Sequence, residues 1–229
     1  RFRSPLGAVL GGGGAAPAPN RAECWRTQTS ALHAEAVLPL LVGNDSVHGH
    51  ANLHGAVLFP HHIGQGCAND AQLVEELARV AALESSACGL NWIFSPCVAV
   101  PLDLRWGRTY ECFGEEPALV GRLAAAEVRG LQRAGVPVAA CVKHWIGDGA
   151  TTFGTGTRDM ALLFGSPPGV LDQGDARLSD AELRGVHMPP YVDALAAGAL
   201  TVMVSYSSVR SCKVHASRHW LTDVLKTEL

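Results

Sequence analysis

The 229-residue sequence lacks several features that define common classes of protein. It has no C-x-x-C pair, and its seven cysteines are scattered, so neither a zinc ribbon nor a small disulfide scaffold is indicated. No run approaches the ~20 apolar residues of a membrane span. The formal net charge is only -3, without runs of one sign, and supplies no field for nucleic acid or an anionic membrane. We therefore expect a neutral small-molecule partner, no nucleic acid and no membrane.

The beginning of the chain also lacks familiar features. RFRSPLGAVLGGGG contains neither an initiator methionine nor the long apolar core of a signal peptide, and we expect the chain to be a piece of a longer protein. The cysteines are expected to be buried mostly as small apolar side chains. Their odd number is compatible with a reducing compartment but does not determine the localisation. The sequence does not determine the oligomeric state either.

What the chain does contain is a globular composition, 48% hydrophobic and 17% charged, with length for one substantial core. One pattern occurs three times: a helical stretch ends at a glycine, an apolar run follows, and the run ends in polar residues. The glycines are Gly89, Gly135 and Gly198, at the position where a helix C-terminus favours a left-handed residue. The segments are 87–97, 133–144 and 196–206. This pattern predicts a repeated helix-to-strand unit.

Helices are predicted before these runs. Apolar residues at helical spacing indicate a helix within 69–88. The predicted helix starts are a capping box of Asn69 with Gln72, a first-turn proline at Pro117, and a second capping box of Ser179 with Glu182. Helices therefore separate the strands.

Three earlier apolar runs, 6–14, 38–45 and 55–64, bring the predicted strands to six. Nearly continuous apolar strands separated by helices predict an α/β fold with a parallel sheet buried on both faces. Residues 146–178 hold seven glycines and no clear periodicity, so we predict a loop on the rim of the binding pocket.

Polar groups follow the predicted strands, at the edge of a parallel sheet where ligands bind. They are Asp45, His48, His50, His54, His61, His62, Arg108, Lys143, His144, Asp148 and Tyr206. Several have simpler interpretations. Asp45 could form an Asx turn, Arg108 could pair with a carboxylate such as Glu111, and Tyr206 could lie at the edge of the core.

Lys143 is the most informative of these residues. A lysine at the end of an apolar strand needs an anionic neighbour or a ligand, because lysine is seldom buried unpaired. A carboxylate and several cationic donors on one rim suit a polyhydroxylated ligand, whose hydroxyls can both donate and accept. A phosphate fits less well, because Pro17 and Pro19 interrupt the glycine-rich loop after the first run.

Several segments resemble, in order, the N-terminal (β/α)8-barrel domain of glycoside hydrolase family 3, in the branch of β-glucosidases and exo-β-glucanases. They are GNDSVHGHANLHGAVLFPHHIGQG, FSPCVAVPLDLRWGRTYECFGEEP, VKHWIGDGATTFGT, LSDAELRGVHMPPYVDALAAG and TVMVSYSS. The resemblance runs over 1–229 as one partial domain and implies an incomplete TIM-type barrel. It implies a retaining hydrolase that releases terminal β-D-glucose from β-glucosides or β-glucans without a cofactor or metal. The GDG after His144 favours glucosides within the family.

The resemblance also implies roles for particular residues. Asp45, Arg108, Lys143, His144 and Tyr206 match the residues that grip the sugar ring. The family's nucleophilic aspartate lies on the next strand and its acid/base glutamate in a later domain, both beyond Leu229. We therefore expect no catalytic carboxylate in this chain and no activity from it alone. Two departures, Leu104 for a proline and Val209 for a tryptophan, bear on specificity rather than on family. Secretion is favoured only by the resemblance.

Two alternatives stay open. A metal-dependent barrel hydrolase would use His48 and His50 as an H-x-H pair, with Lys143 as a modified bridging ligand. A sugar-binding relic without chemistry would differ from an enzyme only in what lies beyond Leu229. His187, within a predicted helix, is interpreted as structural.

Overall fold

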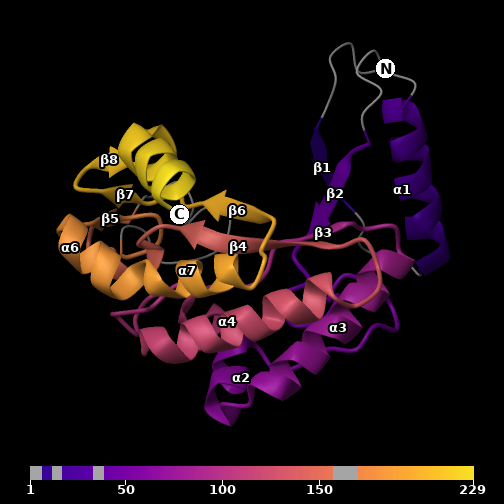
Figure 1. Cartoon of the computed structure of the whole chain (residues 1–229), viewed down its shortest axis with the longest axis horizontal. Coiled ribbons are helices and arrows are strands. Elements are labelled where there is room, and N and C mark those ends of the chain that lie inside the picture. The colour runs from indigo at the N-terminus through magenta and orange to yellow at the C-terminus, as the bar shows by residue number, and fades with distance from the viewer. Residues whose placement is uncertain (1–6, 12–16, 33–38, 157–169) are drawn as a thin grey trace.

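The fold is known from a computed structural model, which describes residues 7–11, 17–32, 39–156 and 170–229. Its main sheet has five parallel strands in the order β1-β2-β3-β4-β6. These strands are β1 (Ala8–Leu10), β2 (Leu41–Asn44), β3 (Trp92–Ile93), β4 (Ala139–Trp145) and β6 (Thr201–Val204). The sheet curls from β1 and β2 toward β4 and β6 (Figure 1). This half-barrel confirms the predicted α/β class and incomplete (β/α) barrel.

Helices and a small second sheet surround the half-barrel, and α3 and α4 run along one side of it (Figure 1). The helices are α1 (Pro17–Leu32), α2 (His62–Ala68), α3 (Ala71–Ala87), α4 (Pro117–Gln132), α6 (Asp180–Glu182) and α7 (Pro189–Ala196). The 3-10 turns are η1 (Thr109–Glu111), η2 (Asp148–Ala150) and η4 (Val214–Ala216), and the π-type segments are η3 (Leu183–His187) and η5 (His219–Glu228). The second sheet contains β5 (Asp175–Ala176), β7 (Ser208–Val209) and β8 (Cys212–Lys213). Within the described residues, no helix is both long and apolar enough to span a membrane.

The helix boundaries follow local capping chemistry. The three predicted glycines have φ of 90°, 78° and 101°, so all three lie in the left-handed region. Pro117 begins α4, and Ser179 with Glu182 forms the predicted capping box of α6. The predicted cap Asn69 is wrong: Asp70 accepts a hydrogen bond from the backbone N–H of Leu73. Asn69 instead has φ of 54° and ends α2.

The core lies between the sheet and the helices. β4 is its centre, with Ala140, Cys141 and Val142 all fully buried. α3 and α4 approach so closely that a Cβ on Gly130 would clash with the main-chain oxygen of Glu75. A glycine at this position therefore sets the distance between the two helices.

The predicted strand at 55–64 is wrong. Residues 56–61 form no strand, and α2 starts at His62. The Phe59 N–H bonds back to the oxygen of His48, and Pro60 has no N–H to give to a sheet. Val57 and Leu58 are 46% and 59% exposed, so this apolar run is not a buried strand.

The predicted rim loop at 146–178 is only partly correct, and its residues 157–169 lie outside the described residues. Its first part is not an exposed loop, because Ile146, Asp148 and Thr151 are buried and η2 forms a turn there. Its last part contains β5, which pairs with β7 in parallel. Short segments held by tertiary contacts leave no periodic pattern in a sequence.

Candidate functional site

Three of the five predicted site residues, Asp45, Lys143 and His144, lie at the carboxyl ends of β2 and β4. The last three residues of β4 are Lys143, His144 and Trp145, and Asp45 follows β2 directly. The β4–β6 register shifts between Lys143, which pairs with Met203, and Trp145, so His144 falls in a bulge. Two peptide bonds here, Lys143–His144 and Trp145–Ile146, are cis. Because the strands are parallel, these ends share one edge of the sheet.

Lys143 and Asp45 form an ion pair, with 2.6 Å between Nζ and Oδ1. This confirms the prediction that Lys143 needs an anionic neighbour. The side chain of Lys143 is 4% exposed and that of Asp45 is 60% exposed. A buried ammonium therefore orients a carboxylate that keeps free access to solvent, where it can accept hydrogen bonds from a ligand.

Arg108 forms a bidentate pair with Glu111, from Nε to Oε1 at 2.9 Å and from an Nη to Oε2 at 2.7 Å. This confirms the simpler interpretation of Arg108. The same guanidinium also lies 3.1 Å from Nε2 of His144. Burial disfavours the charge, but the Glu111 carboxylate outweighs it and raises the pKa of Arg108 above its ordinary value. Arg108 is therefore a fixed cation at the strand ends.

His144 has two neighbours that favour opposite protonation states. Its Nδ1 donates to Asp148 Oδ2 at 2.9 Å, while Nε2 lies 3.1 Å from the guanidinium of Arg108. Burial disfavours the charged ring, but Asp148 and the Cys97 thiol outweigh burial and raise the pKa of His144 to about 8. Only the neutral ring can accept from Arg108, whereas Asp148 stabilises the imidazolium. Protonation of the ring as the pH falls through about 8 therefore replaces an attraction to Arg108 by a repulsion.

Tyr206 lies two residues after β6 and is 67% exposed. Its ring lies edge-on to His215 with centroids 6.0 Å apart, and its main-chain oxygen accepts from Lys213 at 2.6 Å. Within the described part of the chain, no hydrogen bond joins Tyr206 to the other four predicted residues. The structure thus joins four of the five in two contacting pairs, and the sugar-binding role of all five stays a prediction.

Sequence reasoning missed the partners that orient the site. Asp148 was visible as a strand-end group, and the structure shows that it orients His144. Glu127 carried one signal that was not used: it is a lone carboxylate on the apolar face of α4 and is 4% exposed. Cys97 and Cys112 lie in one buried cluster beneath these groups. Hydrogen bonds from Cys112 and His144 outweigh burial and lower the pKa of the Cys97 thiol.

The residues proposed for a metal site are engaged elsewhere. His48 donates from Nδ1 to the main-chain oxygen of Phe59 at 2.8 Å. Its ring packs on that of His61, with 3.9 Å between the ring centroids. His50 is fully buried, and Lys143 is paired with Asp45. Among the described residues, no three His, Cys, Asp or Glu side chains are grouped to hold a metal ion. His187 is buried, and burial lowers its pKa.

A cavity of about 370 Å³ lies elsewhere, between the β7–β8 hairpin and η5. It is lined by Asp180, Val209, Arg210, Cys212, Ser217, His219 and Trp220. None of these residues belongs to the predicted site. Asp180 already pairs with both Arg210 and His219, so the charged groups of the cavity satisfy each other.

A curled parallel sheet surrounded by helices, with a carboxylate, an ammonium and an imidazole at its strand ends, defines a (β/α)-barrel type of domain. Over residues 3–229 the chain matches the family described as Glycosyl hydrolase family 3 N terminal domain, and it belongs to that family. The family resemblance predicted from the sequence is therefore confirmed.

Two of its relatives are β-glucosidases. The chain is 30% identical over 202 residues to the lysosomal beta glucosidase of Dictyostelium discoideum, covering 84% of this chain and 23% of that protein. It is 29% identical over 195 residues to the periplasmic beta-glucosidase of Salmonella typhimurium, covering 83% of this chain and 23% of that protein. The chain thus spans about a quarter of the length of these relatives.

Solved structures of glycosidases have a similar fold. The exo-1,3/1,4-beta-glucanase of a Pseudoalteromonas species superposes with a TM-score of 0.85 at 34% identity, over 99% of this chain and 29% of that one. The beta-glucosidase of Listeria innocua, solved in complex with isofagomine, has a TM-score of 0.81 at 28% identity, over 97% of this chain and 28% of that one.

Proposed function

We propose that this chain supplies the sugar-binding half of the active site of a retaining glycosidase that releases terminal β-D-glucose from β-glucosides or β-glucans. The observation that carries the proposal is a set of two pairs, Asp45 with Lys143 and Arg108 with His144, that involve consecutive residues at the carboxyl end of β4. The family relatives described above, a β-glucosidase and an exo-β-glucanase, support the substrate class.

Each group has a chemical role in holding the sugar. The exposed Asp45 carboxylate accepts hydrogen bonds from adjacent hydroxyls, and Lys143 fixes its orientation. Arg108 and protonated His144 donate to hydroxyl oxygens, and Tyr206 contributes a phenol at the rim. Such a site discriminates against analogues that lack a hydroxyl, because its polar groups would then be left unpaired.

The proposed chemistry needs two carboxyl groups ~5 Å apart, one to attack the anomeric carbon and one to protonate the leaving oxygen. By family resemblance, the nucleophile follows on the strand after η5 and the acid/base belongs to a later domain. Lys143 and Arg108 would help to keep the nucleophile ionised. The 229 residues alone are then expected to bind a sugar and to hydrolyse nothing.

Two measurements test this proposal. Glucose or a cationic glucose analogue is titrated into the 229-residue chain, with chemical shifts of the His144 ring as the readout, and hydrolysis of an aryl β-glucoside is followed in parallel. Saturable shifts without hydrolysis are expected. Hydrolysis that Lys143→Ala abolishes would refute the proposal that the chain alone is inactive. Unchanged His144 shifts at high sugar concentration would refute the proposal that it binds a sugar.

The coding sequence downstream separates an enzyme from a relic. A further apolar strand ending in Ser-Asp is expected after η5 in an enzyme. A reading frame that continues without such a strand would support a sugar-binding domain without chemistry.

A further inference from the structure

A second set of ionisable groups lies beneath the sugar site, outside the roles proposed above. Glu127 is 4% exposed on the face of α4 that packs into the core. Its Oε1 accepts from the hydroxyl of Ser95, and its Oε2 lies 3.0 Å from Nε2 of His62. A buried carboxylate needs such partners, because an unpaired one is strongly destabilising.

His62, at the start of α2, is held on three sides and is 2% exposed. Its Nε2 faces Glu127, and its Nδ1–H donates to the main-chain oxygen of Glu111 at 2.7 Å. Its ring stacks on Phe113, with centroids 4.3 Å apart and planes 21° apart. The ring therefore fixes the backbone of η1 at Glu111.

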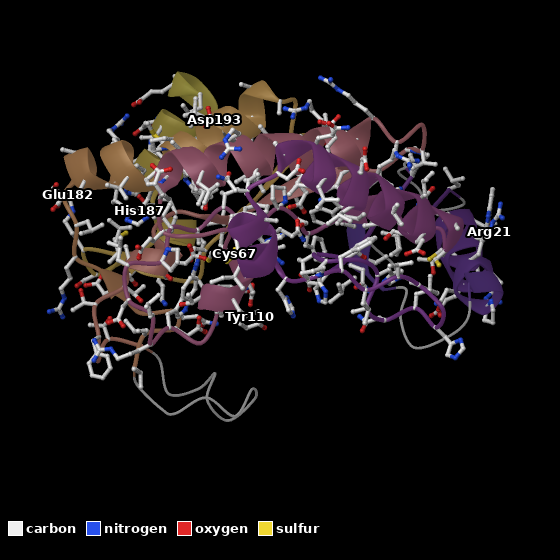
Figure 2. All side chains as sticks on the ribbon, turned by 90° about the horizontal axis from the view of Figure 1, so that it is seen from below. Arg21, Cys67, Tyr110, Glu182, His187 and Asp193 are labelled. Carbon is white, nitrogen blue, oxygen red and sulfur yellow. The ribbon has the colours of Figure 1, made fainter. Side chains whose placement is uncertain are left out.

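Glu111 links this buried pair to the strand ends. Its main-chain oxygen is held by His62, and both oxygens of its side chain hold Arg108. Arg108 in turn lies 3.1 Å from His144. Direct contacts thus run without a gap from α4, through α2 and η1, to the guanidinium in the site. Figure 2 shows α2 and η1 side by side, at the labels Cys67 and Tyr110.

Resting on the sugar site proposed above, we propose that His62 and Glu127 are positioning residues: they hold Glu111, and through it the Arg108 guanidinium, in the place where it binds the sugar. Neither residue touches the sugar. A purely structural pair would stabilise the fold without affecting Arg108 in the folded protein, whereas a positioning pair transmits its own protonation to Arg108.

The protonation of His62 depends on the groups that face it. These are Glu127 from α4, Glu111 from η1, the Cys97 thiol after β3, and His61 beside it. Burial disfavours the charged ring, but Glu127 outweighs burial and raises the pKa of His62. Glu127→Gln keeps the shape and a hydrogen-bonding partner but removes the charge. We expect it to lower the pKa of His62, because the charge that stabilises the imidazolium is gone.

The first test needs no sugar. In the 229-residue chain, the ring shifts of His62 and His144 and the Nε–H resonance of Arg108 are followed against pH by NMR. The Arg108 resonance is expected to show one step at the His62 midpoint and another at the His144 midpoint. In Glu127→Gln the first step moves with His62 and the second stays. An Arg108 resonance that follows His144 alone in both proteins would overturn the proposal.

The second test measures the affinity for a cationic glucose analogue where each variant is fully folded. His62→Phe keeps the ring on Phe113 and removes the bond to Glu111, and we expect about tenfold weaker binding from the displaced Arg108. The control Glu75→Gln removes the ion pair of Glu75 with Arg129, also on α4, and is expected to leave affinity unchanged.

The two proposals fail separately. Equal affinities of His62→Phe and wild type would overturn the positioning role while leaving the sugar site intact. A wild-type chain that binds no sugar but shows both steps in Arg108 would refute the proposed function and retain the positioning role. If His62→Phe does not fold, the pH titration of wild type and Glu127→Gln still decides.

Discussion

Lys143 and Asp45, 98 positions apart in the sequence, are joined by an ion pair of 2.6 Å at the carboxyl ends of β4 and β2. The pair is asymmetric, because the ammonium is buried while the carboxylate is 60% exposed. Its two halves therefore have different consequences when each is removed.

Lys143→Met is expected to weaken sugar binding while leaving the fold intact. The Asp45 carboxylate left behind is solvated, so the free energy of unfolding should change by less than about 1 kcal/mol. Affinity for glucose should fall by about tenfold or more, because Asp45 loses the group that orients it. Calorimetric titration and urea unfolding measure the two effects. Lys226→Met, at an exposed lysine of η5, is the matched control, and an equal loss of affinity there would contradict the prediction.

Asp45→Asn is expected to act mainly on stability. It leaves the Lys143 ammonium buried without its counter-charge, which destabilises the folded state by less than the ~3 kcal/mol of a fully buried pair because Asp45 is exposed to water. Urea unfolding near neutral pH should therefore rank Asp45→Asn well below Lys143→Met in stability. The reverse ranking would show that the ammonium finds another anion.

Stability should fall as the pH rises through the titration of His144. Its pKa is raised from 6.5 to about 8, so the charged ring is stabilised in the folded state. The contribution is fully present below about pH 6.5 and is lost as the pH rises through about 8, with a maximum of about 2 kcal/mol. Denaturant unfolding across this pH range measures it, and Asp148→Asn should flatten this part of the profile. An unchanged slope in Asp148→Asn would assign the effect to another group.

Gly130→Ala is expected to destabilise the packing of α3 on α4. The new methyl group would clash with the main-chain oxygen of Glu75, so the helices must move apart. Overpacking of this kind costs ~1–3 kcal/mol. Gly185→Ala is the matched control, since a Cβ there meets nothing within 4 Å. Thermal unfolding should give Gly130→Ala a clearly lower melting temperature than Gly185→Ala. Equal melting temperatures would show that α3 can move away from α4 without loss of stability.

Two of the seven thiols should react rapidly with a thiol reagent in the native protein. Cys67 and Cys212 are exposed, whereas the other five cysteines are buried and all seven are free. The expected stoichiometry is therefore two fast thiols without denaturant and seven with it. Cys67→Ser should remove one fast thiol and Cys88→Ser none. Fast reaction of a third thiol would reveal local opening of the core.

The sequence predicted the parts of the fold that local chemistry determines. The glycines that end helices, the Ser179 capping box and the buried run before Lys143 all depend on neighbouring residues, and each was found. The segment 55–64 failed because an apolar run alone does not distinguish a strand from a loop that packs one side on the protein. Its Pro60 and the backbone contact to His48 decided the outcome.

The candidate site was predictable only in part, for a similar reason. A buried lysine indicates that an anionic partner exists, because burying an unpaired ammonium is unfavourable. The sequence does not say which carboxylate is that partner. Glu127 and His62 lie 65 positions apart and meet only because α2 packs beside α4, so neither signals the other within its own segment. Pairings of this kind become visible only once the helices are in place.

The register shift on β4 makes the whole arrangement sensitive to the length of one strand. Lys143 and His144 are consecutive, yet one reaches across to Asp45 and the other toward Arg108 and Asp148. Deleting one residue between Ala139 and Val142 would shift the side chains of Lys143 and His144 by one position along β4. Each side chain would then point in the direction that the other has now. Natural variants of this domain should therefore tolerate exchanges of apolar type in that short stretch, but no insertions or deletions.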